Sequence, residues 1–300
     1  MLKRFQGTHP KVPPKETEIK SRPGVFSRLR RNLSGMVGLG LVIIFISIAL
    51  LGALGATPYP PNEQYRADRL KAPSHVYWMG TDLYGRDVSS RIMTGAANSL
   101  RVALLSVALS GTLGTLLGIL SGFVGGLLDT VIMRIMDIFF AFPALLLALV
   151  VVTVLGPGLN NAVIAISIVY TPIFARVARG PVLSVKAMEY ITAARCLGLR
   201  ESYILFRHIL PNMLAPLIVQ FSLALSWALL TEASLSFLGL GTRPPDSSWG
   251  VMLAESRGLA ERAPWLMFYP GLAIVLGVLG FNLLGDGLRD VLDPRMRGRR

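Results

Sequence analysis

The residues best suited to chemistry in this 300-residue chain are few and scattered. Its three histidines are His9, His75 and His208, and its single cysteine is Cys196. His75 and His208 fall in polar segments that long apolar runs separate, so they cannot share a metal ion. The sequence holds no G-x-x-x-x-G-K-[ST] phosphate loop, no HExxH zinc motif and no G-x-S-x-G elbow. We therefore expect no catalytic site, no metal site and no ATP bound by this chain itself.

The ionisable residue in the most unusual setting is Glu232, which follows 19 uncharged residues, 213–231. A charged group at membrane depth costs about 2.5–3.5 kcal/mol on insertion scales, so it should face protein or water. One interpretation places Glu232 and the nearby Ser234 at the outer mouth of a translocation path. The other is an interfacial glutamate just outside the hydrocarbon. The sequence does not separate them.

A second segment, residues 181–211 (PVLSVKAMEYITAARCLGLRESYILFRHILP), is polar and helical in character. Pro181 suits a first helical turn, and good helix formers run to Leu197. Gly198 then predicts a left-handed helix end, and a second short helix is expected from about residue 202 to 209, before Pro211. The pattern predicts a helix–Gly–helix unit. Its local physics fits either an amphipathic helix lying on lipid or a surface that another protein approaches closely.

The elements around these residues are long apolar runs. Hydrophobic residues make up 52% of the chain and charged residues 16%. A helix needs about 20 apolar residues to cross a bilayer, and the uncharged runs are that long or longer. The 38-residue run 138–175 is long enough for two spans, and GPGLNN at 156–161 predicts a short turn between them. We expect six transmembrane helices. The uncharged runs are 33–56, 102–128, 138–175, 213–231 and 264–285.

The charge of +13 is explained by its distribution along the chain. Twenty-one Lys and Arg fall in the segments 1–32, 125–137, 176–212 and 286–300. The segments on the other side, 57–97 and 241–263, carry eight, nearly balanced by seven acidic residues. Positive residues collect on the cytoplasmic side, so we expect both termini and the 181–211 segment to be cytoplasmic. The excess charge is then a topology signal rather than a sign of nucleic-acid binding. The first apolar run is too long for a signal peptide and is expected to be an uncleaved anchor.

The 181–211 segment also carries a recognisable motif. Ala193 and Ala194, then Gly198 and the HILP ending at Pro211, resemble the EAA loop of binding-protein-dependent ABC importer permeases. In that family the loop forms a coupling helix that docks into a groove on the ATPase subunit. The chain departs from the pattern at Thr192, where the family has Glu, and at His208, where it has Ile. The resemblance implies that coupling involves Glu189, Ala193, Ala194, Arg195, Gly198, Leu199 and Pro211.

Three further segments are similar to the peptide and nickel branch of the same family. They are residues 80–87 (GTDLYGRD), residues 232–250 (EASLSFLGLG, then PP and SWG) and residues 281–295 (FNLLGDGLRDVLDPR). Within that branch they look like the second permease subunit of dipeptide, oligopeptide, glutathione or nickel systems.

The resemblance implies an all-α, type I ABC importer permease fold in a bacterial plasma membrane. We expect a tail (1–32), a first transmembrane helix (33–56), an external loop (57–97), a five-helix permease domain (98–287) and a second tail (288–300). Its implied partners are a homologous permease, two ATPases that bind ATP and Mg²⁺, an external solute-binding protein and the lipid membrane. The implied cargo is peptides, with nickel chelates or glutathione as the alternative.

Two more local patterns refine this expectation. Asp82 and Arg86, and likewise Asp87 and Arg91, stand four apart, which predicts a short outer helix with a solvated face or a contact with the binding protein. Glycines 114, 118 and 122 line one helix face and predict close helix packing, with a pore-lining face as the alternative. An ion-driven transporter would need ionisable residues at mid-membrane and repeat symmetry, and neither is visible in the sequence. A membrane scaffold is the other remaining class.

Overall fold

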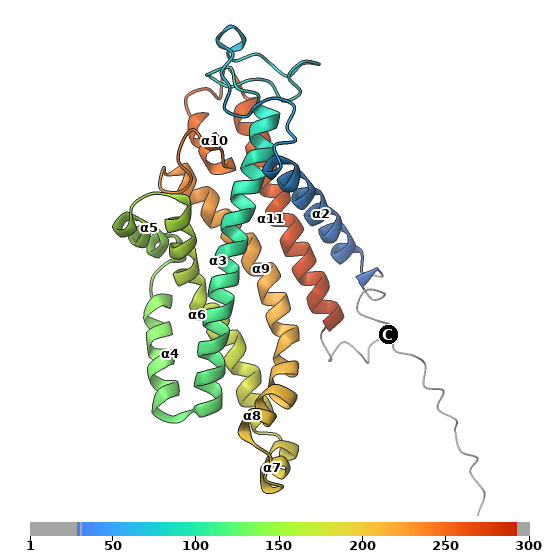
Figure 1. Ribbon diagram of the computed structural model, residues 1–300, viewed down its shortest axis with the longest axis vertical. Coiled ribbons are helices and arrows are strands. Elements are labelled where there is room, and N and C mark those ends of the chain that lie inside the picture. Colours follow the sequence, from blue (N-terminus) through green and yellow to red (C-terminus); the bar gives the residue numbers. More distant parts are fainter. Residues whose placement is uncertain (1–28, 31, 293–300) are drawn as a thin grey trace, which may run out of the picture.

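The computed structural model describes residues 29–30 and 32–292 and shows a bundle of long helices, without strands in that part of the chain (Figure 1). The all-α prediction is confirmed. At one end of the bundle lies α7, which we call the α7 end, and at the other lies α10, the α10 end. The elements are α2 (Leu33–Ala53), η1 (Arg66–Asp68), α3 (Val88–Val124), α4 (Gly126–Phe140), α5 (Ala144–Leu155), α6 (Leu159–Lys186), α7 (Glu189–Cys196), α8 (Glu201–Ile204), η2 (Leu205–Ile209), α9 (Leu210–Phe237), α10 (Trp249–Glu255) and α11 (Trp265–Leu292).

Five stretches of helix are long and apolar enough to cross a membrane: α2, α3, α6, α11 and the continuous helix Glu201–Phe237. A sixth span exists if α4 and α5 count together, although they meet at a bend of 93°. The predicted turn near 156–161 is confirmed between α5 and α6. The prediction of one span from residue 138 to that turn was wrong. Instead α4 begins at Gly126 and ends at Phe140, and α5 begins after Pro143. The break arises because a proline disfavours helical geometry in the residue that precedes it.

Two other prolines do not mark helix boundaries where the sequence predicted them. Pro181 lies inside α6 rather than at a helix start. Pro211 lies in the first turn of α9, and the short helix before it continues through the π-helical turn Leu205–Ile209. Because proline lacks an N–H and crowds the carbonyl four residues back, a widened turn accommodates it without breaking the axis. The second helix of the 181–211 segment is therefore an extension of a membrane helix.

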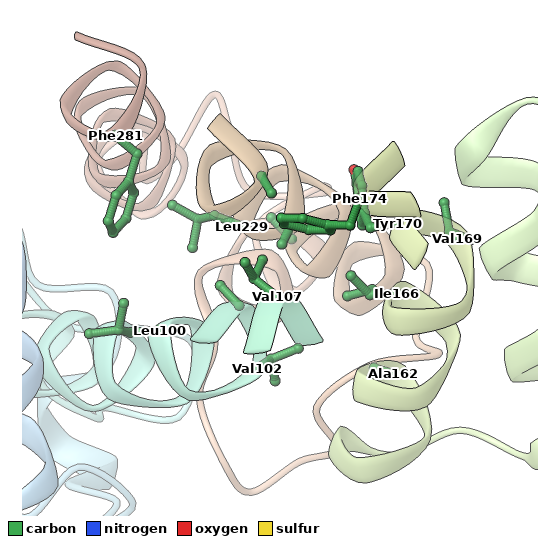
Figure 2. Packing of buried hydrophobic residues seen from close by; sticks show 14 of the residues in the cluster. Leu100, Val102, Val107, Ala162, Ile166, Val169, Tyr170, Phe174, Leu229 and Phe281 are labelled. Atoms are coloured by element: carbon green, nitrogen blue, oxygen red, sulfur yellow. The ribbon is translucent and has the colours of Figure 1, made fainter. Parts of the chain in front are cut away.

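The centre of the bundle is the contact between α3 and α6. A side chain at Gly114 would collide with the Thr171 carbonyl, and one at Gly118 with the Ala175 carbonyl. The glycine row therefore brings two helix backbones together, which confirms the close-packing prediction. Around this contact α9 and α11 complete a core of buried apolar side chains (Figure 2), among them Val107, Ile166, Phe174, Leu229 and Phe281.

Helix α2 packs along α11 and the part of α3 nearest the α10 end. Asn32 caps α2 by accepting from the Gly35 N–H (3.1 Å), and it donates to Asp290 Oδ2 of α11 (2.9 Å). Helix α3 begins at Val88, so its first turns occupy part of the expected external loop 57–97. The predicted tails 1–32 and 288–300 lie largely outside the described residues, although α11 extends to Leu292.

Candidate functional site

The α7 end of the molecule is a two-helix projection that extends the bundle. Helix α7 begins after Met188 and ends at Cys196, and Gly198 reverses the chain with a φ of 77°. That value lies in the left-handed region where glycine has no steric cost, so the predicted helix stop is confirmed. Ile191 and Ala194 lie on the face of α7 that packs against the rest of the chain and are buried, while the opposite face of α7 is exposed. The chain then returns through α8 and η2 directly into α9.

Two sets of side-chain contacts hold the projection together. The Arg195 guanidinium donates two hydrogen bonds to the Glu201 carboxylate (2.8 and 3.1 Å), and this pairing raises the pKa of Arg195. The His208 ring lies between Tyr190 of α7 and Tyr203 of α8, with ring centroids 5.7 and 5.9 Å away. These contacts tie α7 to the helix that continues as α9. These edge-to-face ring contacts were not predicted from the sequence, although Tyr203, close before the unusual His208, was a visible signal.

Beside α7 lies a shallow groove with apolar walls and cationic edges. Leu199, Tyr203 and Phe206 are exposed by 40%, 50% and 66%, although they are large apolar residues. Arg200 and Arg207 stand beside them and line the same groove. Such a surface buries little within the chain and suits a protein partner with apolar and acidic side chains.

The structure places six of the seven residues predicted for coupling on α7 or in the turn that follows, and one in the first turn of α9. Most of them are exposed. Ala194 is buried on the inner face of α7, and Arg195 is half-buried in its ion pair. These two residues therefore stabilise the projection rather than offer a surface to a partner. The exposed residues are Glu189, Ala193, Gly198, Leu199 and Pro211.

At the α10 end, the structure encloses Glu232 completely. Its Oε1 accepts a hydrogen bond from Ser236 (2.7 Å), and Oε2 has no partner among the described residues. The hydroxyls of Ser99 and Ser248 lie beside the same carboxyl. Ser234 is half-buried and donates to the Leu230 carbonyl (2.8 Å). Glu232 therefore lies inside the protein where α3, α9 and α10 meet, enclosed by other side chains rather than exposed at a surface.

Helix α10 is inserted between the long helices. Trp249 Nε1 donates to the Ile92 carbonyl of α3 (3.0 Å), and the Trp249 ring lies 4.9 Å from that of Phe45. A side chain at Gly250 would collide with the Ala233 carbonyl of α9. Close backbone approach, rather than flexibility, thus requires glycine here. Within the resemblance motif at 232–250, Gly250 lets α10 approach α9 closely.

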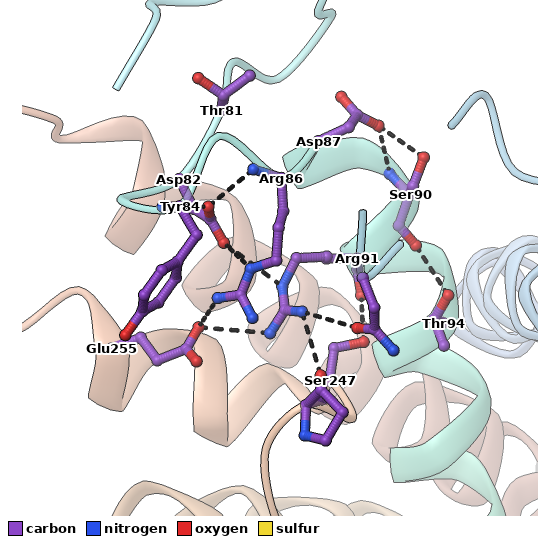
Figure 3. Close-up of polar contacts among 12 residues, drawn as sticks. Thr81, Asp82, Tyr84, Arg86, Asp87, Ser90, Arg91, Thr94, Ser247 and Glu255 are labelled. Carbon is purple, nitrogen blue, oxygen red and sulfur yellow. Dashed lines mark hydrogen bonds and ion pairs between the residues drawn. The ribbon is translucent and has the colours of Figure 1, made fainter. Parts of the chain in front are cut away.

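The predicted short outer helix was wrong. Asp82 and Arg86 do pair (2.5 Å), but across a turn, and Asp87 caps α3 instead of pairing with Arg91. Arg91 reaches Glu255 of the α10 helix (3.3 Å), as does Arg86 (2.8 Å; Figure 3). The four residues of the two predicted pairs, Asp82, Arg86, Asp87 and Arg91, are all buried. They form an internal network rather than a solvated face.

The preceding loop is held by a smaller cluster. The Asp68 carboxylate pairs with Lys71 and accepts from the Tyr77 hydroxyl (2.7 Å). The Lys71 contact, followed by that of Tyr77, lowers the pKa of Asp68. The same hydrogen bond raises the pKa of Tyr77 to about 12. The cluster closes the loop over the start of α3.

Comparisons with known proteins agree with this geometry. Residues 114–298 match the family described as binding-protein-dependent transport system inner membrane component, and residues 24–73 match the N-terminal TM domain of oligopeptide transport permease C. The chain is 45% identical to the dipeptide transport system permease protein DppC of Alkalihalophilus pseudofirmus, over 96% of this chain and 95% of that one. It is also 45% identical to the glutathione transport system permease protein GsiD of Pectobacterium atrosepticum, over 90% and 89%.

A solved structure shares the fold at low sequence identity. The inward-facing MetNI methionine ABC transporter matches with a TM-score of 0.56 and 19% identity, over 67% of this chain and 96% of that one. Family, relatives and fold are those of type I ABC importer permeases. The chain belongs to the family of binding-protein-dependent transport system inner membrane components, in the branch of the dipeptide and oligopeptide permeases.

Proposed function

We propose that this chain forms half of the translocation path of an ATP-driven peptide importer. A homologous permease forms the other half, two ATPase subunits bind and hydrolyse ATP with Mg²⁺, and an external binding protein delivers the cargo. Di- or oligopeptides are the cargo that the names of most of the similar relatives support. Glutathione is the second candidate, since one relative of equal identity is named for it.

The observation that carries the proposal is the projection at the α7 end. It presents exposed apolar side chains to a partner, and its second helix is continuous with α9 over residues 201–237. A push on α7 by an ATPase therefore reaches the α10 end along one rigid element. Closure of the ATPases would move such projections and switch the path between inward-open and outward-open states, as rigid-body alternating access.

Charge placement supports the orientation. The basic segment 176–212 lies at the α7 end, so we assign that end to the cytoplasm of a bacterial cell, and we infer from the basic residues of 1–32 and 286–300 in the sequence that both termini are cytoplasmic too. The buried network of Arg86, Arg91 and Glu255 then lies at the external end of the bundle, beneath the surface on which the binding protein docks.

The test replaces Gly198 by valine in the complete importer reconstituted in proteoliposomes. A β-branched residue is strained at a φ of 77°, so α7 shifts. The matched control is Gly126→Val, also at positive φ (62°) and also with open space around it, but outside the projection. We expect Gly198→Val to abolish binding-protein-stimulated ATP hydrolysis and uptake while the protein stays in the membrane, and Gly126→Val to retain both. Equal activity in the two variants would contradict the coupling assignment.

Ala193→Arg addresses the docking surface without straining the backbone. Ala193 is exposed on α7, so a long cation is tolerated by the chain itself but blocks a closely fitted partner. We expect loss of ATPase co-purification. Cargo is tested separately, by uptake of labelled dipeptide, glutathione and nickel chelate into the same vesicles.

A further inference from the structure

Glu232 is a fully buried carboxyl group that neither the coupling surface at the α7 end nor the network around Arg91 uses. It takes part in none of the ion pairs that the described residues form. Enclosing a carboxyl group without a counter-ion costs free energy, so its position inside the protein requires a physical reason. The groups that surround it supply that reason.

Three hydroxyl groups surround the Glu232 carboxyl, and each comes from a different element. Ser236 lies one turn further along α9 and donates to Oε1 (2.7 Å). Ser99 of α3 and Ser248, the N-cap of α10, lie beside the same carboxyl. Oε2 and the Ser99 hydroxyl have no hydrogen-bond partner among the described residues, so each is available to the other when the helices shift. We call these four residues the Glu232 junction.

The segment that contains α10 packs tightly on this end of α9. A side chain at Gly241 would collide with the Ser236 hydroxyl, and Gly250 lies directly against the Ala233 carbonyl. The Thr242 N–H also donates to the Ser236 hydroxyl (3.1 Å). Close-packed surfaces of this kind transmit a push, because they cannot be compressed. They resist a pull much less, since separating apolar surfaces breaks no directional bond.

Hydrogen bonds to a buried group do resist separation. Pulling α10 away from α9 would leave the Glu232 carboxyl with fewer partners inside the protein, at the full cost of an unsatisfied buried group. The other polar link between the two helices is Arg257, which donates to the Phe237 carbonyl (3.2 Å) and lies 3.8 Å from the centroid of its ring. Arg257 is exposed, and exposed contacts of a cation contribute little. Glu232 is therefore the stronger link.

The α10 segment is in turn attached to the external end of α3. The Asn98 side chain donates to the Ser247 carbonyl (2.8 Å), and the Ser247 hydroxyl donates to the Arg91 carbonyl (3.1 Å). A displacement of α9 that reaches α10 is thus passed on to α3 as well.

We propose that Glu232 is a positioning residue that transmits the movement of α9 to α10 and to the external end of α3. This rests on the proposed function, in which the ATPases move α9 through the projection at the α7 end. Glu232 then acts on the external end of the path through α10, without contacting the cargo.

The test measures the ratio of ATP hydrolysed to dipeptide transported by the complete importer in proteoliposomes. Without the Glu232 carboxyl the ATPases still cycle, but the external end follows them poorly. We expect Glu232→Ala to raise the ratio at least about fivefold, the lower end of a typical coupling between two sites. Glu232→Gln should keep a ratio near that of the wild type, because an amide also donates to and accepts from hydroxyl groups. Arg257→Met, which removes only the exposed link, should do the same.

A purely structural role of Glu232 would lower hydrolysis and uptake together and leave the ratio unchanged. That result would overturn the proposal, as would an equal rise in Arg257→Met or in Glu232→Gln. If Glu232→Ala does not reach the membrane, Ser99→Ala decides, because the Ser99 hydroxyl has no other hydrogen bond among the described residues. Its ratio should rise in the same direction by a smaller factor, and an unchanged ratio would contradict the proposal.

Gly198→Val separates this proposal from the proposed function. If Gly198→Val abolishes uptake while Glu232→Ala leaves the ratio unchanged, only the role of Glu232 fails. If Gly198→Val transports normally, the coupling through α7 fails, and the role of Glu232 fails with it.

Discussion

The attachment of α7 to the bundle can be tested by removing one buried side chain. Ile191 is fully buried beneath the eight-residue helix, and α7 has few other buried residues. Replacing a buried isoleucine by alanine costs about 2–5 kcal/mol. The site lies at the tip of the projection and can partly collapse, so we expect a cost of about 2–3 kcal/mol here. That cost shifts the equilibrium between α7 packed against the bundle and α7 detached from it by roughly 30- to 150-fold.

The spans should be unaffected by Ile191→Ala, because none of their core contacts is removed. We expect faster hydrogen exchange in α7 amides and unchanged exchange in α3 and α6. We also expect a loss of coupled ATP hydrolysis comparable to the shift in the α7 packing equilibrium. Ile135→Ala is the control, because Ile135 is 45% exposed on α4. Unchanged exchange in α7, or full uptake despite accelerated exchange, would refute the view that α7 packed against the bundle transmits the movement of the ATPases.

Three further predictions concern the rest of the fold. Gly118→Leu forces α3 away from the α6 backbone and should lower the thermal stability of the detergent-solubilised protein sharply, whereas Gly40→Leu, with open space around it, should not. Glu255→Ala leaves Arg91 buried without its main partner, at a cost of about 3–5 kcal/mol, and Arg91→Met in addition should recover much of the lost melting temperature. The lowered pKa of Asp68 means that its contacts stabilise the outer loop above the ordinary aspartate pKa and are lost as pH falls through the lowered value. Proteolysis of that loop should therefore increase at acid pH in the wild-type protein and be less pH-dependent in Asp68→Asn.

The sequence predicted those features that depend on local chain physics. Long uncharged runs gave the spans, since crossing hydrocarbon requires about 20 apolar residues. Gly198 gave the end of α7 because few other residues adopt a positive φ there. The glycine row on α3 gave a close helix contact, since three small residues on one face have that consequence at any depth.

Features that depend on distant partners could not be obtained in this way. Arg91 is four residues from Asp87, yet its partner Glu255 lies 164 residues further on. Pro211 read as a helix end, but tertiary packing carries α9 through it over a π turn. Glu232 read as interfacial or path-facing, because burial beneath α10 is invisible until the chain folds back. In each case a long-range contact outweighed the local preference.

The claim that α7 is the site of ATPase docking can be tested most directly with the native thiol. Cys196 is the last residue of α7 and is exposed. A photo-crosslinker attached there, in a complete importer whose other subunits lack reactive cysteines, should form a covalent product with the ATPase subunit on illumination. A cysteine at Gly258, near the α10 end in a Cys196→Ser background, should give no such product. An actively transporting complex in which Cys196 never crosslinks to the ATPase would contradict the account.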